Sequence, residues 1–529
     1  MYIRRLLPRL AGVAAIAFWG SIAPVNAQAG QPARAPAQHE HVAPQTADEQ
    51  AAPQTADPHA GHVTSPGDAH AGHDMASMAR DGSGTSWLPD ETPMYAFHGQ
   101  ANGWTLMGHG NVFLQYLHES GVRGSSQTGG INWLMGMASR PAGNGRFMAR
   151  GMASAEPWTI RGCGYPDLLA SGEVCKGAAI HDRQHPHDLF LELAAGYDRP
   201  LAQGVRLQLY AAPVGEPALG PVAFMHRLSG MPNPIAPITH HWFDATHIAY
   251  GVVTGGLYGG RWKAETSLFN GREPDEKRAN FDFAALDSWS ARVSLIPAKR
   301  WSLQVSGGHL TAAEAGHAGG PRVDVNRVTA SAIYHRTLGD AGVWADTIGW
   351  GRNAEAGGEA TNALLVETSL TLRDRDVWFG RLEWSQKTSH DLDLAVDDVF
   401  EVGKLQGGYT RYLAGWKGMK PGVGAALSAG IVPGELEAAY GRRVNAGAGV
   451  FVTLRPAAPA IAVAASSPAG HTMVMTATDP AKLTCPTPVD VTRVSSTIYN
   501  GTTYYFCSAS DRDEFLKNPA MNVAMMPKP

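Results

Sequence analysis

Apolar and polar residues alternate along the middle of the chain, between about residue 93 and residue 455. Over 289–295, the residues Trp, Ala, Val and Leu alternate with Ser, Arg and Ser. The same pattern recurs over 301–306, 364–373 and 378–385, with one polar exception on the apolar side at Thr368. A period of two residues is typical of β-strands that have one apolar and one polar face. The middle of the chain is therefore predicted to be all-β.

The connections between these strands alternate in length. Short turns are predicted at 140–145, 198–204, 258–261, 297–300, 337–342 and 373–376. Long polar or glycine-rich loops lie between them, at 120–130, 161–188, 214–246, 270–287, 311–325, 351–361 and 387–401. A soluble β-sandwich would share the strand pattern, but turns at one end and loops at the other are typical of outer-membrane β-barrels.

We therefore predict a transmembrane antiparallel β-barrel of about 16 strands, which starts near Trp104 and ends with a strand near 446–454. Its inward positions include charged residues (Arg292, Glu367, Arg381 and Glu383), which favours a wet lumen. In an even-stranded barrel both termini lie on the side of the short turns, which is the periplasmic side. We expect the protein in the cell outer membrane, in contact with its lipid, with both termini periplasmic.

Composition excludes other classes. Charged residues make up 17% of the 529 residues, and the net charge of −4 comes without any basic block, so nucleic acid is not an expected partner. Only the extreme N-terminus approaches the length and apolarity of a spanning helix, which excludes a polytopic helical membrane protein.

The N-terminus, 1–27, is predicted to be a signal peptide. Three arginines (Arg4, Arg5 and Arg9) precede an apolar stretch over 10–23, and Val25-Asn26-Ala27 resembles a cleavage site. An anchor helix is the alternative, but Gly20 and Pro24 interrupt the apolar part. Export places the cysteines in an oxidising compartment, where they can pair.

Segments of different composition flank the predicted barrel, 93–455. Residues 28–92 are rich in Ala, Pro, Gln, Asp and His, a composition that predicts a disordered arm. After the barrel, 456–478 is an Ala/Pro-containing linker and 479–529 is a small cysteine-containing unit.

The arm carries closely spaced histidines and a methionine, which are candidate metal ligands: His39, His41, His59, His62, His70, His73 and Met75. Imidazole suits copper, zinc and nickel, and thioether favours Cu(I). The arm could alternatively be a solvated linker.

A second group of candidate metal ligands occupies two long loops: His181, His185, His187, Asp188, His240, His241, Asp244 and His247, with His226 between them. Adjacent loops meet at a barrel mouth, so these residues could converge on one ion. They could equally form a structural plug, or a hydrolytic site with His as base and Asp as its orienter. We predict a disulfide between Cys163 and Cys175, which would pin the first loop.

Three segments, 182–189, 240–247 and 270–276, resemble those of a poorly characterised family of predicted outer-membrane barrels associated with heavy-metal handling. The resemblance spans most of 93–455. A histidine-bearing arm ahead of a barrel is also similar in plan to the B-type copper-resistance outer-membrane proteins, although the dense methionine repeats of those proteins are missing.

The C-terminal unit resembles a YHS domain, a small module often found with metal transporters. The likeness rests on 484–486, 499–508, Phe515 and 518–519. Asp511 replaces the second cysteine of the family after the Phe-Cys-Ser run, and 494–496 replaces its histidine-bearing triplet. The resemblance implies Cys485 and Cys507 as metal ligands, and a disulfide that staples a small fold is the alternative.

Together these patterns predict a non-enzymatic outer-membrane barrel that binds or passes a transition-metal ion, copper or else zinc, in metal resistance. Periplasmic metal-efflux or metal-oxidation components are the expected protein partners. One alternative is a passive porin with structural loops, and another is an outer-membrane hydrolase that uses the loop His/Asp residues.

Overall fold

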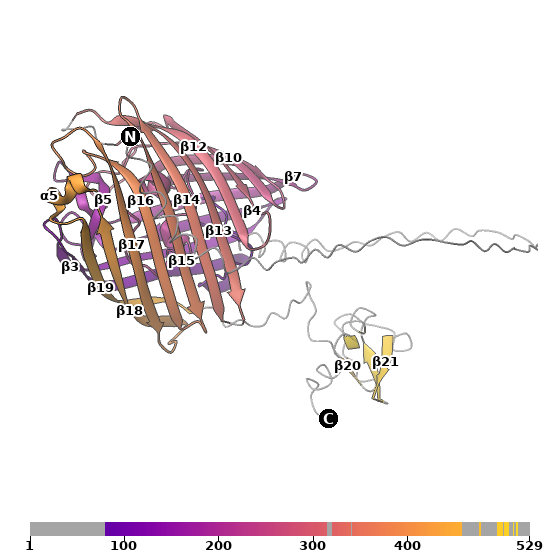
Figure 1. The fold of residues 1–529 in the computed structure, drawn as a ribbon. Coiled ribbons are helices and arrows are strands. Elements are labelled where there is room, and N and C mark those ends of the chain that lie inside the picture. Colours follow the sequence, from indigo (N-terminus) through magenta and orange to yellow (C-terminus); the bar gives the residue numbers. More distant parts are fainter. Residues whose placement is uncertain are drawn as a thin grey trace, which may run out of the picture. The chain divides into compact units, whose positions relative to one another are not determined.

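The computed structural model describes residues 80–314, 320–339 and 341–457, together with 476–477, 495–500, 502–506, 512 and 515–516. Sixteen antiparallel strands form a closed barrel, which confirms the predicted fold class and strand number (Figure 1). The strands are β2 (Trp104–Glu119), β3 (Ser126–Ala142), β4 (Gly145–Ala153), β7 (Phe190–Ala202), β8 (Val205–Gly215), β9 (Ala249–Tyr258), β10 (Trp262–Phe269), β11 (Ser288–Leu295), β12 (Trp301–Glu314), β13 (Val323–Leu338), β14 (Gly342–Glu355), β15 (Ala360–Leu372), β16 (Asp376–Thr388), β17 (Val399–Tyr412), β18 (Met419–Ile431) and β19 (Val444–Pro456).

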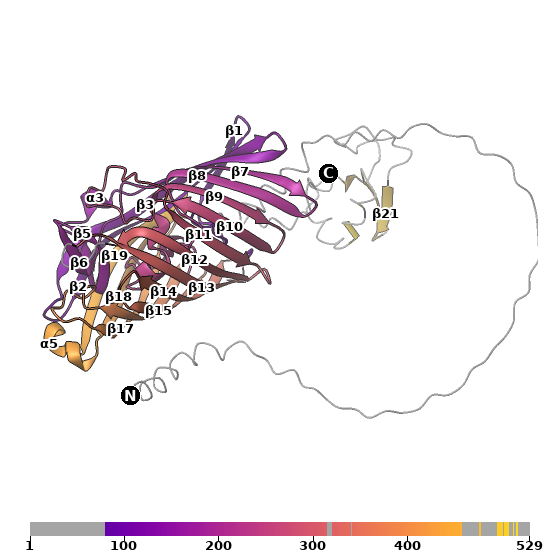
Figure 2. The same ribbon diagram turned by 90° about the horizontal axis from the view of Figure 1, so that it is seen from above.

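The barrel closes where β19 pairs with β2, from Gly447 opposite Glu119 to Leu454 opposite Val112. The connections at one end of the barrel, here called the turn end, are all short, whereas those at the other, the loop end, include the longest ones, 154–189, 216–248 and 270–287 (Figure 2). The loop-end connection between β14 and β15, 356–359, is an exception to the predicted long loop at 351–361. The first barrel strand begins and the last one finishes at the turn end. A short strand, β1 (Phe97–Ala101), adds to the start of β2.

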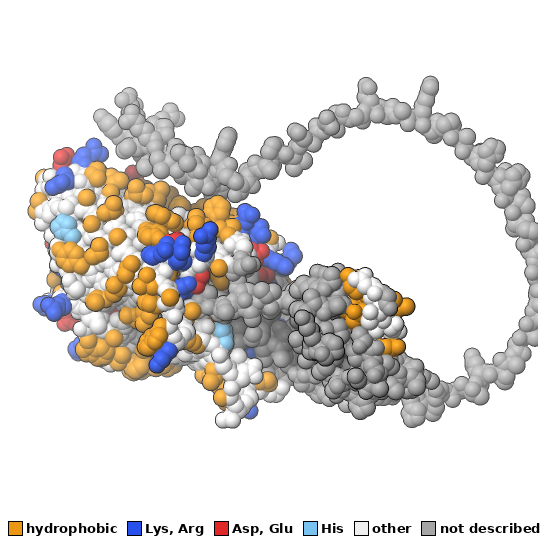
Figure 3. All heavy atoms as spheres, turned by 90° about the horizontal axis from the view of Figure 1, so that it is seen from below, with side chains coloured by type: hydrophobic (Ala, Val, Ile, Leu, Met, Phe, Trp, Pro, Cys, Tyr) orange, Lys and Arg blue, Asp and Glu red, His pale blue; other side chains and the backbone are white. Residues whose placement is uncertain are grey.

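Side chains alternate between the outer surface and the lumen along each strand. On β11, Trp289 and Val293 are 52% and 49% exposed, whereas Ser290 and Arg292 are buried. Figure 3 shows hydrophobic side chains spread over the outside of the barrel, which suits a lipid environment. No helix in the described ranges is long and apolar enough to span a bilayer.

Three segments fill the lumen. Residues 82–89 of the N-terminal segment are all buried, and so are all residues of 216–248 except Met231, Pro232 and Ala245. We call 216–248 the plug loop; it contains η1 (Phe224–His226), α4 (His240–Phe243) and η2 (Ala245–His247). The third segment, 154–189, contains α3 (Glu156–Thr159) and the hairpin of β5 (Tyr165–Cys175) and β6 (Ala178–Gln184).

The expectation of a wet lumen is therefore wrong at the charged positions on which it was based. Four charged side chains point inward but are at most 2% exposed, because the plug loop covers them: Arg292, Glu367, Arg381 and Glu383.

The last residues of the predicted arm, 80–92 of 28–92, pack inside the barrel. There Trp87 packs edge-on against Tyr258, with the ring centres 5.7 Å apart, and the Lys263 ammonium lies over its ring.

The plug loop is bonded to the wall over a wide arc. It forms hydrogen bonds with Ser267 on β10, Ser306 on β12, Thr347 on β14, Glu367 on β15, Glu383 on β16 and Gln406 on β17. Because these strands span much of the circumference, the plug loop is held as part of the fold.

The described C-terminal residues form a separate small sheet in the order β20 (Thr476–Ala477), β22 (Thr502–Phe506), β21 (Ser495–Tyr499). Tyr504, Phe506 and Phe515 form its buried core.

Candidate functional site: imidazoles in the plug

Five of the predicted histidines meet inside the lumen: His185, His187, His240, His241 and His247. We call them the plug imidazole cluster. Their ring centres are 5.1 Å apart for His240 and His247, 5.4 Å for His187 and His247, and 5.4 Å for His240 and His241. His185 lies 6.2 Å from His241. Residues separated by up to 62 positions in the chain are thus brought into one cluster.

Two parts of the chain place the five imidazole rings in the cluster. His185 and His187 follow the end of β6 and are separated by Pro186, so their side chains leave the backbone in a restrained segment. His240 and His241 open α4, and His247 ends the adjoining turn η2. The plug loop thus contributes three rings and the connection after β6 contributes two.

Each ring in the cluster has its Nδ1 atom held by an oxygen. His187 Nδ1 donates to Glu156 Oε2 at 3.0 Å, and His240 Nδ1 donates to Asp244 Oδ1 at 2.7 Å. His247 Nδ1 donates to the Asp244 carbonyl oxygen at 2.7 Å.

The other two rings pair with glutamates. His241 Nδ1 lies 3.0 Å from Glu273 Oε1, and His185 Nδ1 lies 3.2 Å from Glu173 Oε2. The hydrogen bond of His185 Nδ1 is to the Pro186 carbonyl oxygen, at 3.3 Å. An Nδ1–H that is held in this way leaves the Nε2 lone pair of a neutral ring available.

The Nε2 atoms of His185, His241 and His247 are buried and have no hydrogen-bond partner among the described residues. Burial lowers the pKa of His185 and His247 well below the ordinary value, so both rings are neutral near pH 7. At His241 burial also lowers the pKa, but the hydrogen bond and charge of Glu273 outweigh it and raise the pKa. A buried Nε2 lone pair without a hydrogen-bond partner is available to bind a ligand.

The three remaining loop residues predicted as metal ligands are placed differently. His181 is not part of the cluster but borders the same acidic cavity as His241, and its Nδ1 lies 3.2 Å from the Asp391 carbonyl oxygen. Asp188 accepts a hydrogen bond from Tyr250 at 2.5 Å and pairs with Arg278. Asp244 pairs with Arg227 and orients His240, so its carboxylate is already engaged.

Toward the loop end, His241 borders a small acidic cavity of about 40 Å³. Its carboxylates come from five different parts of the chain: Glu173, Glu273, Glu314, Glu355 and Asp391. A cavity of this size accepts a water molecule or an ion but no organic substrate. Within the described ranges, no group of three or more His, Cys, Asp or Glu side chains is arranged so that it could hold a metal ion as it stands.

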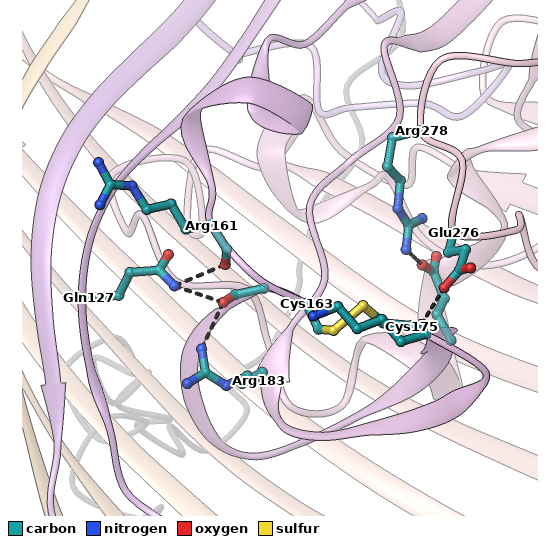
Figure 4. The surroundings of a disulfide bond; sticks show 10 residues. Gln127, Arg161, Cys163, Cys175, Arg183, Glu276 and Arg278 are labelled. Carbon is teal, nitrogen blue, oxygen red and sulfur yellow. Dashed lines mark hydrogen bonds and ion pairs between the residues drawn. A yellow bond between two sulfur atoms is a disulfide. The ribbon is translucent and has the colours of Figure 1, made fainter.

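The structure confirms the disulfide between Cys163 and Cys175, which joins a residue just before β5 to the last residue of β5 (Figure 4). Around it, Arg183 donates to the Gly164 carbonyl oxygen at 2.9 Å, and the Lys176 backbone N–H donates to Glu276. The hairpin that leads into His185 and His187 is thereby fixed at both ends.

The remaining candidates lie outside the described residues. These are the arm residues His39, His41, His59, His62, His70, His73 and Met75, and the pair Cys485 and Cys507. Their metal binding, and the alternative disulfide between the two cysteines, stay predictions.

The groups that orient the rings were not predicted from the sequence. Glu156 and Glu173 lie in different parts of the segment 154–189, Glu273 lies in another loop, and none of the three carries a motif of its own. Glu273 lies within the family-like segment 270–276, which was the only signal that could have marked it.

No protein-family model matches the chain, and no curated protein matches it. Among solved structures the chain is similar to OmpT of Vibrio cholerae, an outer membrane protein, at 8% identity, over 67% of this chain and 98% of that chain, with a TM-score of 0.40. It is similar to an anion-selective porin from Comamonas acidovorans at 11% identity, over 66% and 99% of the two chains, with a TM-score of 0.41. The outer membrane channel DcaP of Acinetobacter baumannii matches at 10% identity, over 68% and 100%, with a TM-score of 0.38. With identities and TM-scores this low, the comparisons indicate neither a transported molecule nor an activity for this chain. The structure itself is an outer-membrane-type barrel with a histidine-rich plug.

Proposed function

We propose that this barrel binds a transition-metal ion, copper or else zinc, at the plug imidazole cluster, as part of metal handling in the outer membrane. The observation that carries the proposal is the free, buried Nε2 atoms of His185, His241 and His247, whose Nδ1 atoms are held by oxygens. Metal-binding histidines are oriented in this way in most proteins, because the outer hydrogen bond fixes the tautomer and the ring.

The spacing of the rings supports the same reading. Two imidazoles that share a tetrahedral ion at about 2.0 Å have ring centres about 5 Å apart. The pairs His240–His247, His240–His241 and His187–His247 lie at 5.1, 5.4 and 5.4 Å. Since the described side chains form no ready ligand group, binding requires the segments that carry the rings to shift until the Nε2 atoms converge, with the Nδ1 contacts kept.

The acidic cavity beside His241 would attract cations to the plug imidazole cluster. Glu173 and Glu273 contact both the cavity and the rings, so a cation held among these carboxylates is already adjacent to His241. The arm histidines and the cysteine pair would add further binding capacity on this proposal.

The test is a calorimetric titration of the full mature chain in detergent with Zn(II) and with Cu(II). Other histidines also bind these ions, so the informative quantity is the difference between variants. We expect His241→Gln/His247→Gln to lose one tight-binding equivalent. The matched control His98→Gln/His118→Gln replaces two exposed histidines and should retain it.

Equal stoichiometry and affinity in both variants would refute the proposal. Conductance in planar bilayers then separates the alternatives. A passive porin would conduct ions without metal dependence, whereas a hydrolase would show turnover that is lost in His185→Ala.

A further inference from the structure

The methionines of the described residues gather in one part of the barrel, separated from the plug imidazole cluster by Phe224 of η1. All except Met419 lie in or against this region: Met94, Met107, Met135, Met137, Met148, Met152, Met225 and Met231. Elsewhere the inward positions of the wall are mostly polar, as on β11, where they are Ser288, Ser290, Arg292 and Ser294. The inward-facing methionines therefore differ from the mostly polar inward residues of the other strands.

Strand register brings the donor atoms together. Met107 on β2 lies directly opposite Met137 on β3. In the next inward row, His109 on β2 lies opposite Met135 on β3, which in turn lies opposite Met152 on β4. Residues directly opposite each other on one sheet face have Cβ atoms about 5 Å apart. We call Met107, Met135, Met137 and His109 the thioether site.

These side chains border a cavity of about 40 Å³, which has room for an ion or a water molecule. His109 Nε2 lies 2.9 Å from Met135 Sδ, so an imidazole nitrogen faces a sulfur rather than the usual oxygen. The His226 ring, from η1 of the plug loop, lies 5.5 Å from the His109 ring and borders the same cavity.

We propose that the thioether site binds a soft monovalent cation, Cu(I) or Ag(I), through methionine sulfurs and the His109 imidazole. Thioethers and imidazoles select such ions, and Zn(II) or Ca(II) would favour harder ligands. Methionine also fills irregular cores. Packing alone, however, would be served equally by Leu or Ile and would not require two imidazoles at the cavity.

The thioether site and the plug imidazole cluster lie on either side of η1. The Phe224 ring stacks on His187 with ring centres 6.0 Å apart, and His226, two residues later, contacts His109. The barrel would thus hold a nitrogen-rich site and a sulfur-rich site next to one helical turn. The inference does not depend on metal binding at the first of these.

The test is NMR of the full chain labelled with ¹³C at the methionine methyl groups, titrated with Ag(I) as a redox-inert probe. Met135→Leu and Met137→Leu assign their resonances, because leucine keeps the volume and removes the sulfur. We expect the Met107, Met135 and Met137 methyls to shift together with a single midpoint. Met148, which is buried on β4 but does not border the cavity, and Met419 are the internal controls.

In the Met107→Leu/Met135→Leu variant the remaining Met137 shift should need at least tenfold more Ag(I). Unmoved resonances at the thioether site, while other methionines respond to Ag(I), would overturn the inference and leave a packing role. The same titration in His241→Gln/His247→Gln separates the two proposals. The methyl shifts should persist there, and their loss would contradict an independent site.

Discussion

Arg227 Nε donates to Glu367 Oε2 at 2.8 Å, and both side chains are fully buried. The same guanidinium donates to Asp244 Oδ2 at 2.7 Å, and Glu367 also accepts from Arg381 at 2.9 Å. This network joins the plug loop to β15 and β16. Through Asp244 it also reaches His240 of the plug imidazole cluster.

Arg227→Met should destabilise the protein by about 3–5 kcal/mol, because it leaves Asp244 and Glu367 buried with one fewer partner each. Urea unfolding in detergent measures the loss, and bilayer recordings should show added channel openings as the plug loosens. The control Arg411→Met breaks the exposed pair with Asp376 and should change little. Equal effects of the two substitutions would contradict a plug held by this network.

Gly172→Ala should weaken metal binding at the plug imidazole cluster at least about tenfold without altering any ligand. Gly172 has φ +114°, and a Cβ atom there would collide with the His241 ring. Calorimetry with Zn(II) measures the change. Gly177→Ala is the matched control, because Gly177 has φ +76° in the same hairpin but open space around a Cβ. An unchanged affinity in Gly172→Ala would argue against His241 as a ligand.

Glu216→Gln should flatten the pH dependence of stability. Burial raises the pKa of Glu216 to about 8, because desolvation of the carboxylate outweighs the charge of Arg292 and the hydrogen bond of Ser83, which both lower it. The native state therefore holds a proton that the unfolded chain, with a pKa of about 4.3, releases. Stability should fall as pH rises between about 4 and 8, by at most about 1.4 kcal/mol per unit.

Urea midpoints measured at several pH values for both proteins give this difference directly. Because other groups titrate equally in the two chains, subtraction isolates residue 216. Parallel profiles for wild type and Glu216→Gln would show that the carboxyl is not held neutral by burial.

Cys163→Ser/Cys175→Ser should destabilise the β5–β6 hairpin by about 2–4 kcal/mol, since the disulfide closes a short loop with a sequence separation of 12. We expect faster trypsin cleavage at Lys176 and Arg183, while the barrel strands keep their protection from hydrogen exchange. Cleavage at the wild-type rate would mean that the hydrogen bonds of Arg183 and Lys176 suffice to hold the hairpin.

Leu405→Arg should destabilise the barrel in lipid vesicles by about 2–4 kcal/mol, because Leu405 lies in the middle of β17 and is 50% exposed on the outer surface. Leu413→Arg, at the turn end and 49% exposed, should cost about 1 kcal/mol or less. Folded fractions in urea measure both. The same cost at both positions would contradict a bilayer centred on the strands.

Local pattern in the sequence was sufficient for much of the fold. The alternation over 289–295 predicts which residues of β11 face lipid, and the structure confirms Trp289 and Val293 on the outside. The lengths of the connections predict the two ends of the barrel, and the number of strands follows from counting them. Alternation and connection length are local features of the sequence, so they can be recognised without knowing which distant segments are in contact.

What fills the lumen was decided only by the tertiary structure. The plug loop buries charged residues that the sequence pattern assigned to a wet lumen. The pattern shows that a side chain faces inward, but it does not show whether water or another segment of the chain lies against that side chain. The pairs His187–Glu156 and His241–Glu273 and the row His109–Met135–Met152 join segments whose proximity depends on strand register and on how the loops fold inward. Alternation determines the face of a residue, whereas its partners depend on long-range packing of the whole barrel.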